Sequence, residues 1–176
     1  MTLQDNSQIR AVQPEDAAAI TAIYNHYVLH SVATFETASV DPTEMASRIR
    51  DTQRRPWLVF ERDGVVAGYA YACPWKERQA YSRTVETTVY VAHGQGGKGI
   101  GKALYEALIA LLRQQGIHAA LGGISLPNAA SIALHDRLGF SHVGTLREVG
   151  YKQERWVDVG YWEMLLSSAP PNGGEV

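Results

Sequence analysis

The feature of the sequence that most constrains the fold is a strand that runs through a glycine-rich turn into a long amphipathic helix. Residues 84–91 (TVETTVYV) alternate so that the valines share one face and Glu86 lies on the other, which predicts a strand. The turn at residues 94–101 is rich in glycine, and apolar residues then recur at three- and four-residue spacing until Gly116 ends the helix. We expect this unit to form the centre of a sheet.

Further strands and helices are predicted around this unit. Pro14 and the segment Asp41-Pro42-Thr43-Glu44 each mark a helix start, and Asp63-Gly64 indicates a tight hairpin turn. The expected order is a strand, two helices, three strands, a helix, a strand, a helix and two strands. This order predicts a single-domain α/β (α+β) fold with a mixed, mainly antiparallel central sheet flanked by helices. The other predicted elements are strands at residues 9–12, 57–61, 65–72, 118–124, 140–145 and 157–166 and a helix at residues 128–138.

Length and composition restrict the class of protein. A chain of 176 residues is long enough for one domain, which we place at residues 7–166, followed by a flexible C-terminal tail at residues 167–176. A formal charge of -2 provides no basic excess for nucleic acid. Because Cys73 is the only cysteine, we expect no disulfide within the chain and a reducing, cytoplasmic location. The N-terminus lacks a signal-peptide pattern and no apolar run approaches a membrane span of roughly 18 residues, so we expect no membrane partner.

The glycine-rich turn indicates an anion site. Glycines let the backbone approach a ligand closely, and the free N–H groups at a helix start favour a group such as pyrophosphate. A tight turn between strand and helix could by itself require one or two glycines. The spacing is not a Walker A loop, since no Gly-Lys-Ser/Thr ends it, nor a convincing dinucleotide fingerprint, since the first βαβ unit does not carry it. An acyl-CoA cofactor therefore fits the turn better.

Two motifs together resemble the GNAT superfamily of N-acetyltransferases. VYV at residues 89–91 followed by GKGIGKAL at residues 97–104 is similar to the acyl-CoA pyrophosphate loop of that family, and LPNAASIALHDRLGF at residues 126–140 resembles its second cofactor segment. The likeness covers nearly the whole chain and implies the GNAT fold with acetyl-CoA as co-substrate. More narrowly, four segments resemble the phosphinothricin N-acetyltransferases: TFE at residues 34–36, PWKERQAY at 74–81, TVETTVYV at 84–91 and RWVDVGYW at 155–162.

The resemblance implies how the cofactor would be held. Backbone groups of residues 89–91 would pair with the pantetheine arm like an added strand, and residues 97–102 would cradle the pyrophosphate. Asn128 would meet the cofactor beyond the thioester. The residues assigned in this way to the cofactor are Val89, Tyr90, Val91, Gly97, Lys98, Gly99, Ile100, Gly101, Lys102 and Asn128.

One position in the turn departs from the family pattern. The family usually has arginine or glutamine where this chain has Gly96, so a side-chain contact to phosphate is missing. Gln95 could replace that contact, or Lys98 and Lys102 could compensate for it. We expect at worst a weaker affinity for the cofactor.

The reaction needs a base for the acceptor ammonium, a donor for the thioester oxygen and help for the leaving thiolate. The resemblance makes Glu86 the base, whereas by itself Glu86 is as readily a solvent-facing glutamate in a salt bridge. Val89 is the nearest backbone donor for the oxygen. His135 is the implied proton donor to the thiolate, and a structural helix histidine is the alternative. We expect direct attack in a ternary complex rather than a Cys73 intermediate, and no metal, because the other histidines lack metal-ligand spacing.

The expected acceptor is a small amine. The acceptor would be bound by cations and a phenol before the central strand and by residues after the first helix, which suit a carboxylate and a phosphinate or sulfone-like group. The alternative is a solvated charged loop, which is usual for such clusters. The resemblance implies phosphinothricin, methionine sulfoximine or methionine sulfone as acceptor. The open alternatives are an acetyltransferase for a peptide N-terminus, lysine or polyamine, and a non-catalytic acyl-CoA-binding domain. The expected acceptor residues are Phe35, Glu36, Lys76, Arg78, Tyr81 and Arg83.

The resemblance also bears on assembly. Family members of this kind are often homodimers, so we expect a homodimer here. Trp156, Tyr161 and Trp162 could supply the apolar surface, although aromatic residues in strands more often belong to the core.

Overall fold

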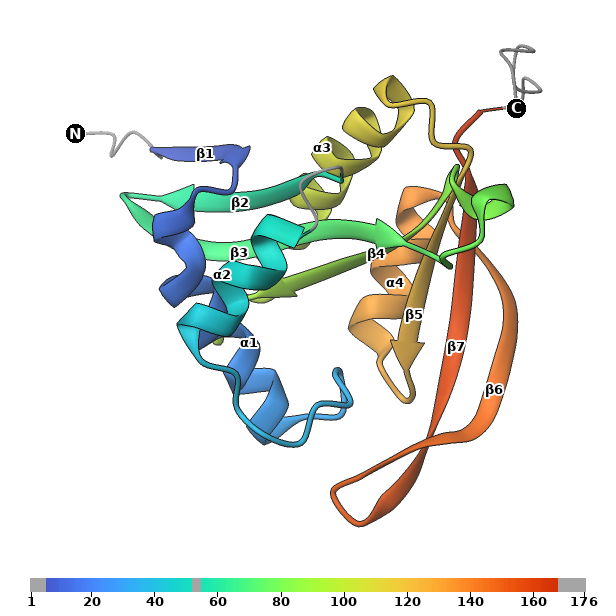
Figure 1. Cartoon of the computed structure of the whole chain (residues 1–176). Helices are drawn as coiled ribbons and strands as arrows, with labels where there is room; N and C mark the ends of the chain where they lie inside the picture. The colour runs from blue at the N-terminus through green and yellow to red at the C-terminus, as the bar shows by residue number, and fades with distance from the viewer. Residues whose placement is uncertain (1–5, 52–54, 168–176) are drawn as a thin grey trace.

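The computed structural model of the chain describes residues 6–51 and 55–167 and has one seven-stranded sheet between helices (Figure 1). The strands lie in the order β1-β2-β3-β4-β5-β7-β6, and every neighbouring pair is antiparallel except β4 and β5. This arrangement confirms the predicted mixed, mainly antiparallel sheet. In chain order the elements are β1 (Ser7–Ala11), η1 (Pro14–Asp16), α1 (Ala17–His30), α2 (Pro42–Asp51), β2 (Trp57–Arg62), β3 (Val65–Pro74), η2 (Gln79–Tyr81), β4 (Thr84–Val91), α3 (Ile100–Gln114), β5 (Ala119–Ser125), α4 (Ala129–Leu138), β6 (Ser141–Lys152) and β7 (Arg155–Leu165).

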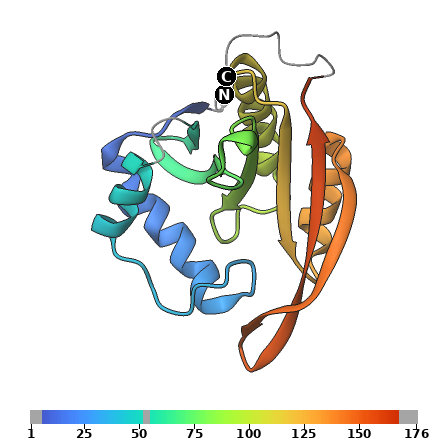
Figure 2. The ribbon, with the colours of Figure 1, turned by 45° about the vertical axis from the view of Figure 1, so that its right-hand side comes forward.

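The two halves of the sheet separate at its centre. β4 and β5 pair only from Thr84 to Glu86, opposite residues 119–121, whereas β4 pairs with β3 up to Val91 and β5 pairs with β7 along its whole length. Each strand therefore follows its antiparallel neighbour, and the parallel pair opens into a V (Figures 1 and 2). This opening starts at Glu86.

The two faces of the sheet are covered by different helices. α3 packs on the face that carries Val85, where the larger apolar core lies, and α1 with α2 covers the opposite face, where Tyr90 is buried. The predicted alternation of β4 is thereby confirmed. In Figure 1, α4 stands beside α3 on the same side of the sheet.

Local signals in the sequence correspond to local structure. The Asp41 carboxylate accepts hydrogen bonds from the backbone N–H groups of Thr43 and Glu44 at 2.8 and 3.0 Å, as expected for a helix cap. Asp63 and Gly64 both have positive φ, 51° and 77°, which suits the predicted hairpin turn. No helix in the described part of the chain is long and apolar enough to cross a membrane. Residues 168–176 of the predicted tail lie outside the described residues.

The prediction was wrong about the length of the β6–β7 hairpin. A strand was expected at residues 140–145, but β6 continues to Lys152. The pairing shifts between Leu146 and Gly150, where Glu148 has φ 53°, and the turn uses Gln153 and Glu154 at φ 52° and 59°. An irregularity with charged residues interrupts the apolar alternation, and the turn has no glycine to mark it. The longer hairpin reaches the α1–α2 loop, residues 31–41 (Figure 2).

Candidate functional site

The V between β4 and β5 is a cleft with a volume of about 480 Å³, closed at the back by α3 and α4. All of the residues predicted to hold the cofactor line this cleft except Lys98. Tyr27, Tyr105 and Arg137 also line it, and none of them was predicted as a site residue, although Arg137 lies within the second cofactor segment. The cleft is open at the surface and is large enough for an extended ligand.

One wall of the cleft is a strand edge. Within the described residues β4 has no strand partner on its β5 side beyond Glu86, so backbone groups from Thr87 to Val91 face the opening. The Tyr27 hydroxyl donates to the carbonyl oxygen of Val91 at 2.6 Å and holds the end of this edge. An unpaired edge is suited to a ligand with its own amide groups, which can pair with it like a further strand.

The turn after β4 presents the start of α3 to the cleft. Gly97 and Gly99 have φ 75° and 81°, a conformation that side chains disfavour, and Gly99 is the N-cap of the 15-residue helix. Free N–H groups and the helix dipole make this end an anion site. An added Cβ on Gly101 would lie 3.4 Å from Leu134 of α4, so the two helices approach closely there.

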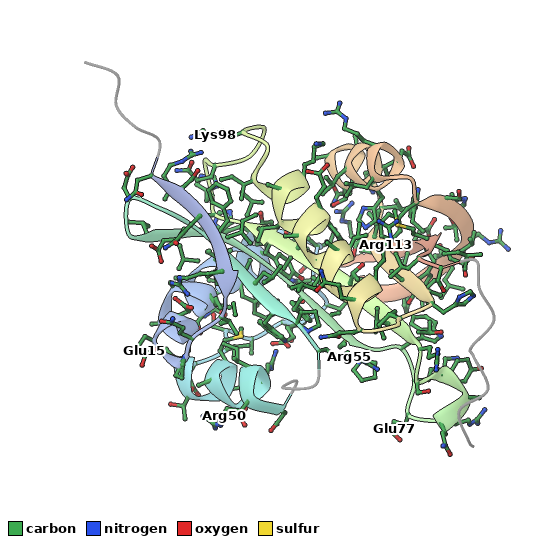
Figure 3. All side chains as sticks on the ribbon, turned by 90° about the horizontal axis from the view of Figure 1, so that it is seen from above. Glu15, Arg50, Arg55, Glu77, Lys98 and Arg113 are labelled. Carbon is green, nitrogen blue, oxygen red and sulfur yellow. The ribbon has the colours of Figure 1, made fainter. Side chains whose placement is uncertain are left out.

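The lysines of the turn already have side-chain partners. Lys98, at the tip of the turn in Figure 3, donates to the Gln95 side-chain oxygen at 2.8 Å, and Lys102 pairs with Glu106 at 2.8 Å. Both contacts are exposed and therefore easily exchanged for a phosphate. At Gly96 the backbone has no positive φ, and an added Cβ would meet no atom within 4 Å.

Glu86 lies where the strands part, on the face covered by α1. Its side chain is half-buried, and burial raises its pKa. An added Cβ on Gly123 of β5 would lie 3.0 Å from Glu86 Oε1, so the glycine leaves room for the carboxylate. A carboxyl group with a raised pKa is better matched to a proton transfer near neutral pH than an exposed one.

Cys73 is the direct neighbour of Glu86 across the β3–β4 pair. Burial, with a further contribution from the Glu86 charge, raises the pKa of its thiol to about 11. The thiol is therefore protonated at neutral pH and is a poor nucleophile. Among the described residues, no group of three or more His, Cys, Asp or Glu side chains is placed to hold a metal ion.

His135 and Tyr105 form a buried pair at the back of the cleft. His135 Nδ1 lies 2.8 Å from the carbonyl oxygen of Ser131, so this nitrogen carries a proton. His135 Nε2 lies 3.2 Å from the Tyr105 hydroxyl, which lies 3.2 Å from the carbonyl oxygen of Thr87. If His135 is protonated, its Nε2–H donates to the Tyr105 hydroxyl, and that hydroxyl donates to the carbonyl oxygen of Thr87. Burial opposes that form and lowers the pKa of His135, so neutral imidazole is the main form at neutral pH and the imidazolium is a minor form that readily loses its proton.

The predicted acceptor residues fall into two groups, and none of them lines the cleft. Phe35 and Glu36 lie in the α1–α2 loop, where Glu36 pairs with Arg48 of α2 at 2.5 Å. The others belong to the segment between β3 and β4, which includes the exposed Lys76, Arg78 and Arg83 and the half-buried Tyr81.

An aromatic contact links the second group to the Glu86 face. The Lys76 ammonium lies 5.5 Å from the ring centre of Trp75 and 5.7 Å from that of Tyr81. Trp75 meets the edge of Tyr161 of β7 at 5.4 Å. The charge of Glu86 contributes to a raised pKa of Tyr161, after burial, so this phenol stands near the carboxylate. Tyr161 was not predicted as a site residue and lacks a local signal for that role.

Comparison with known proteins places nearly the whole chain among acetyltransferases. The family profile described as "Acetyltransferase (GNAT) domain" matches residues 9–160. A phosphinothricin N-acetyltransferase of Streptomyces viridochromogenes is 45% identical over 93% of this chain and 91% of its own length. An L-methionine sulfoximine/L-methionine sulfone acetyltransferase of Salmonella typhimurium is 40% identical over 90% and 94%. The structure of a putative acetyltransferase from Salmonella typhimurium with its cofactor acetyl-CoA superposes with a TM-score of 0.92, at 38% identity, over 96% of this chain and 99% of that one.

Proposed function

This chain belongs to the GNAT family of acetyltransferases, and from that premise we propose that it acetylates the α-amine of a small amino-acid-like acceptor such as phosphinothricin, methionine sulfoximine or methionine sulfone. Acetyl-CoA is its acyl donor. The observation that carries the proposal is the half-buried Glu86 at the point where β4 and β5 part. Glu86 does not itself line the cleft, but it lies beside Gly123, which does, and the cleft has a strand edge and an anion site.

The cleft fits acetyl-CoA at two places. The edge of β4 from Thr87 to Val91 would pair with the amides of the pantetheine arm, and the N–H groups around Gly97 and Gly99 would bind the pyrophosphate. Asn128 caps α4 through its side-chain oxygen and lines the cleft. Acetyl-CoA supplies an acyl group already activated as a thioester, so the protein has to position it and move protons.

Glu86 is proposed to take the proton from the acceptor ammonium, directly or through water. The neutral amine then attacks the carbonyl carbon in a ternary complex, while a backbone N–H near Val89 donates to the oxygen as it gains charge. Cys73, with its raised pKa, takes no part as a nucleophile.

His135 is proposed to supply the proton for the leaving thiolate through Tyr105. The Tyr105 hydroxyl gives its proton to the thiolate sulfur while it receives the Nε2 proton of His135, so tyrosine stays neutral and imidazolium becomes imidazole. The lowered pKa makes the His135 imidazolium a stronger acid, and the step draws on the fraction of His135 that is protonated. Tyr105 would then be the group that touches the sulfur, and His135 would act through it.

The acceptor is tested by thiol release from acetyl-CoA. Purified protein would be assayed with phosphinothricin, methionine sulfoximine, methionine sulfone, common amino acids, polyamines and a peptide with a free N-terminus. We expect kcat/KM for the first three to exceed that for polyamines and the peptide at least about tenfold, because loss of a charge-assisted contact costs roughly 1.5–3 kcal/mol. A preference for the peptide or polyamines would overturn the acceptor assignment. Tight acetyl-CoA binding without thiol release from any acceptor would favour a non-catalytic binding domain.

Gly96→Arg is expected to tighten the binding of acetyl-CoA. Its backbone conformation admits a side chain without strain and no atom obstructs the Cβ, so the guanidinium can reach a phosphate. An exposed ion pair of up to about 1 kcal/mol corresponds to an increase of about two- to fivefold in affinity.

The control for Gly96→Arg is the neighbouring substitution Gly97→Arg, in which φ 75° strains any side chain. We expect that variant to bind acetyl-CoA more weakly than the unaltered protein. Titration calorimetry at low and high salt measures both. An unchanged dissociation constant for Gly96→Arg would show that Gly96 leaves no phosphate contact unfilled.

A homodimer in the cytoplasm is proposed as the working form of the protein. Trp156 of the β6–β7 hairpin is 60% exposed, and its neighbours Val149 and Tyr151 are 54% and 58% exposed, which makes an apolar surface suited to a second copy. Trp162, expected on that surface, is instead 5% exposed and donates from its indole nitrogen to Asp136. Trp156→Glu should convert the dimer to a monomer in analytical ultracentrifugation.

A further inference from the structure

Lys152, near the end of β6, is a cation almost without solvent. The residue is 5% exposed, and burial is the main reason that the pKa of its ammonium is lowered. Its Nζ donates to the carbonyl oxygen of Thr34 at 2.8 Å, across 118 positions of sequence. A buried ammonium is unfavourable unless it is hydrogen-bonded and near an opposite charge, and here the charge comes from the Glu36 carboxylate. A buried, hydrogen-bonded ammonium of this kind is expected to hold a segment of the chain in place.

The segment that Lys152 holds is connected to both sides of the site. The Thr34 hydroxyl lies 2.7 Å from the Tyr24 hydroxyl of α1, and the Tyr90 hydroxyl of β4 donates to the carbonyl oxygen of Ala33 at 3.4 Å. Ala33 and Tyr90 line the cleft. The loop from Ala33 to Glu36 is therefore tied to α1, to β4 and, through Lys152, to the hairpin.

A second contact runs along the same junction. An added Cβ on Gly150 would overlap the ring of Phe35, so the ring lies directly on the strand, where only glycine leaves room. Figures 1 and 2 both show the far end of the hairpin close to the α1–α2 loop. We call this junction of Gly150 and Lys152 with Thr34 and Phe35 the seam.

We propose that Lys152 is a positioning residue for the acceptor: by holding the Thr34 carbonyl against the hairpin, it sets where Phe35 and Glu36 stand. The proposal rests on the proposed function and on the expectation, implied by the sequence resemblance, that Phe35 and Glu36 contact the acceptor. Lys152 itself touches neither substrate. Because Glu36 is also held by Arg48, the loop has a fixed anchor on its α2 side, and Lys152 provides the anchor on the hairpin side.

The test compares Lys152→Met, which keeps most of the length of the side chain without its charge or hydrogen bond, with Lys152→Arg, which keeps the charge. Arg155→Met is the matched control, because Arg155 lies opposite Lys152 in the hairpin and is exposed. Lys152→Met should raise KM for the acceptor at least about tenfold and change kcat and the acetyl-CoA dissociation constant less than about threefold. Lys152→Arg should recover most of the loss, and Arg155→Met should behave like the unaltered protein.

Hydrogen exchange of the loop amides separates this proposal from the proposed function. In Lys152→Met the amides of residues 33–37 should exchange faster. Gly150→Ala, whose methyl group would displace the Phe35 ring from the seam, should speed up exchange of the same amides. Unchanged exchange in both variants would overturn the anchor, whatever the kinetics show. Faster exchange with an unchanged acceptor KM would overturn the positioning role. Faster exchange in a protein that acetylates none of the acceptors would instead overturn the proposed function while the anchor stands.

Discussion

Glu86→Gln is expected to lower kcat by about 10²- to 10⁴-fold at neutral pH, the range typical for loss of a general base. The amide cannot accept the ammonium proton, while it has nearly the size of the carboxylate and fits the space beside Gly123. The defect should shrink as the pH rises past the pKa of the acceptor amine, because free amine then forms without help. Steady-state kinetics from pH 6 to 10 measure this. Equal kcat values at neutral pH would remove Glu86 as the base, and Glu15→Gln, an exposed substitution on η1, is the control (Figure 3).

The same substitution should stabilise the fold. Burial raises the pKa of Glu86, so the folded protein holds the carboxyl proton more tightly than the unfolded chain. Ionised Glu86 consequently lowers the free energy of unfolding once the pH exceeds the ordinary pKa of a glutamate. Glu86→Gln should therefore have a higher Tm than the unaltered protein at pH 7, and the difference should close toward pH 4. A lower Tm at both pH values would mean that the carboxylate makes stabilising contacts instead.

Gly122→Ala is expected to reduce both stability and activity. The added methyl group would overlap the imidazole of His135, which is 4% exposed and hydrogen-bonded at both nitrogens. Overpacking of this kind costs about 1–3 kcal/mol. Displacing His135 also breaks its contact with Tyr105, so we expect kcat to fall at least about tenfold. Thermal unfolding and steady-state kinetics measure the two effects.

A double-mutant cycle identifies the cause. In a His135→Ala background the methyl group has space, so Gly122→Ala should cost much less there. Gly144→Ala on β6 is the control, because an added Cβ meets no atom within 4 Å, and its effect should stay within about 0.5 kcal/mol. Additive losses in the cycle would show that the methyl group acts on something other than His135.

Much of the fold followed from local patterns. The alternation of β4, the spacing of apolar residues in α3, the cap at Asp41 and the turn at Asp63-Gly64 each depend on neighbours within a few positions, and the structure confirms them. The hairpin beyond Thr145 could not be predicted in the same way. Its strand is interrupted at Glu148, and the pairing that holds it is made with β7 rather than within the segment.

In the candidate site, too, some residues had a local sequence signal and others were placed only by long-range packing. The glycine turn and the α4 motif pointed to cofactor residues, and those line the cleft apart from Lys98, although their contacts with acetyl-CoA stay predictions. Tyr105, which contacts the predicted catalytic residue His135, and Lys152, which contacts the loop of the predicted acceptor residues, had no signal in the sequence. Tyr105 reads as one more buried position of α3, and Lys152 reads as an ordinary surface lysine. Only packing places them beside His135 and Thr34.

The sequence by itself determined the strand that carries Glu86 and the glycine turn after it through short-range spacing, and the resemblance of its motifs indicated the GNAT family. The tertiary structure decided where β4 and β5 part, how far Glu86 is buried and which loop Lys152 holds. The physical reason is that desolvation and strand partnership depend on groups brought together from distant positions. No local sequence pattern indicates that the Lys152 ammonium contacts the carbonyl oxygen of Thr34, 118 residues away.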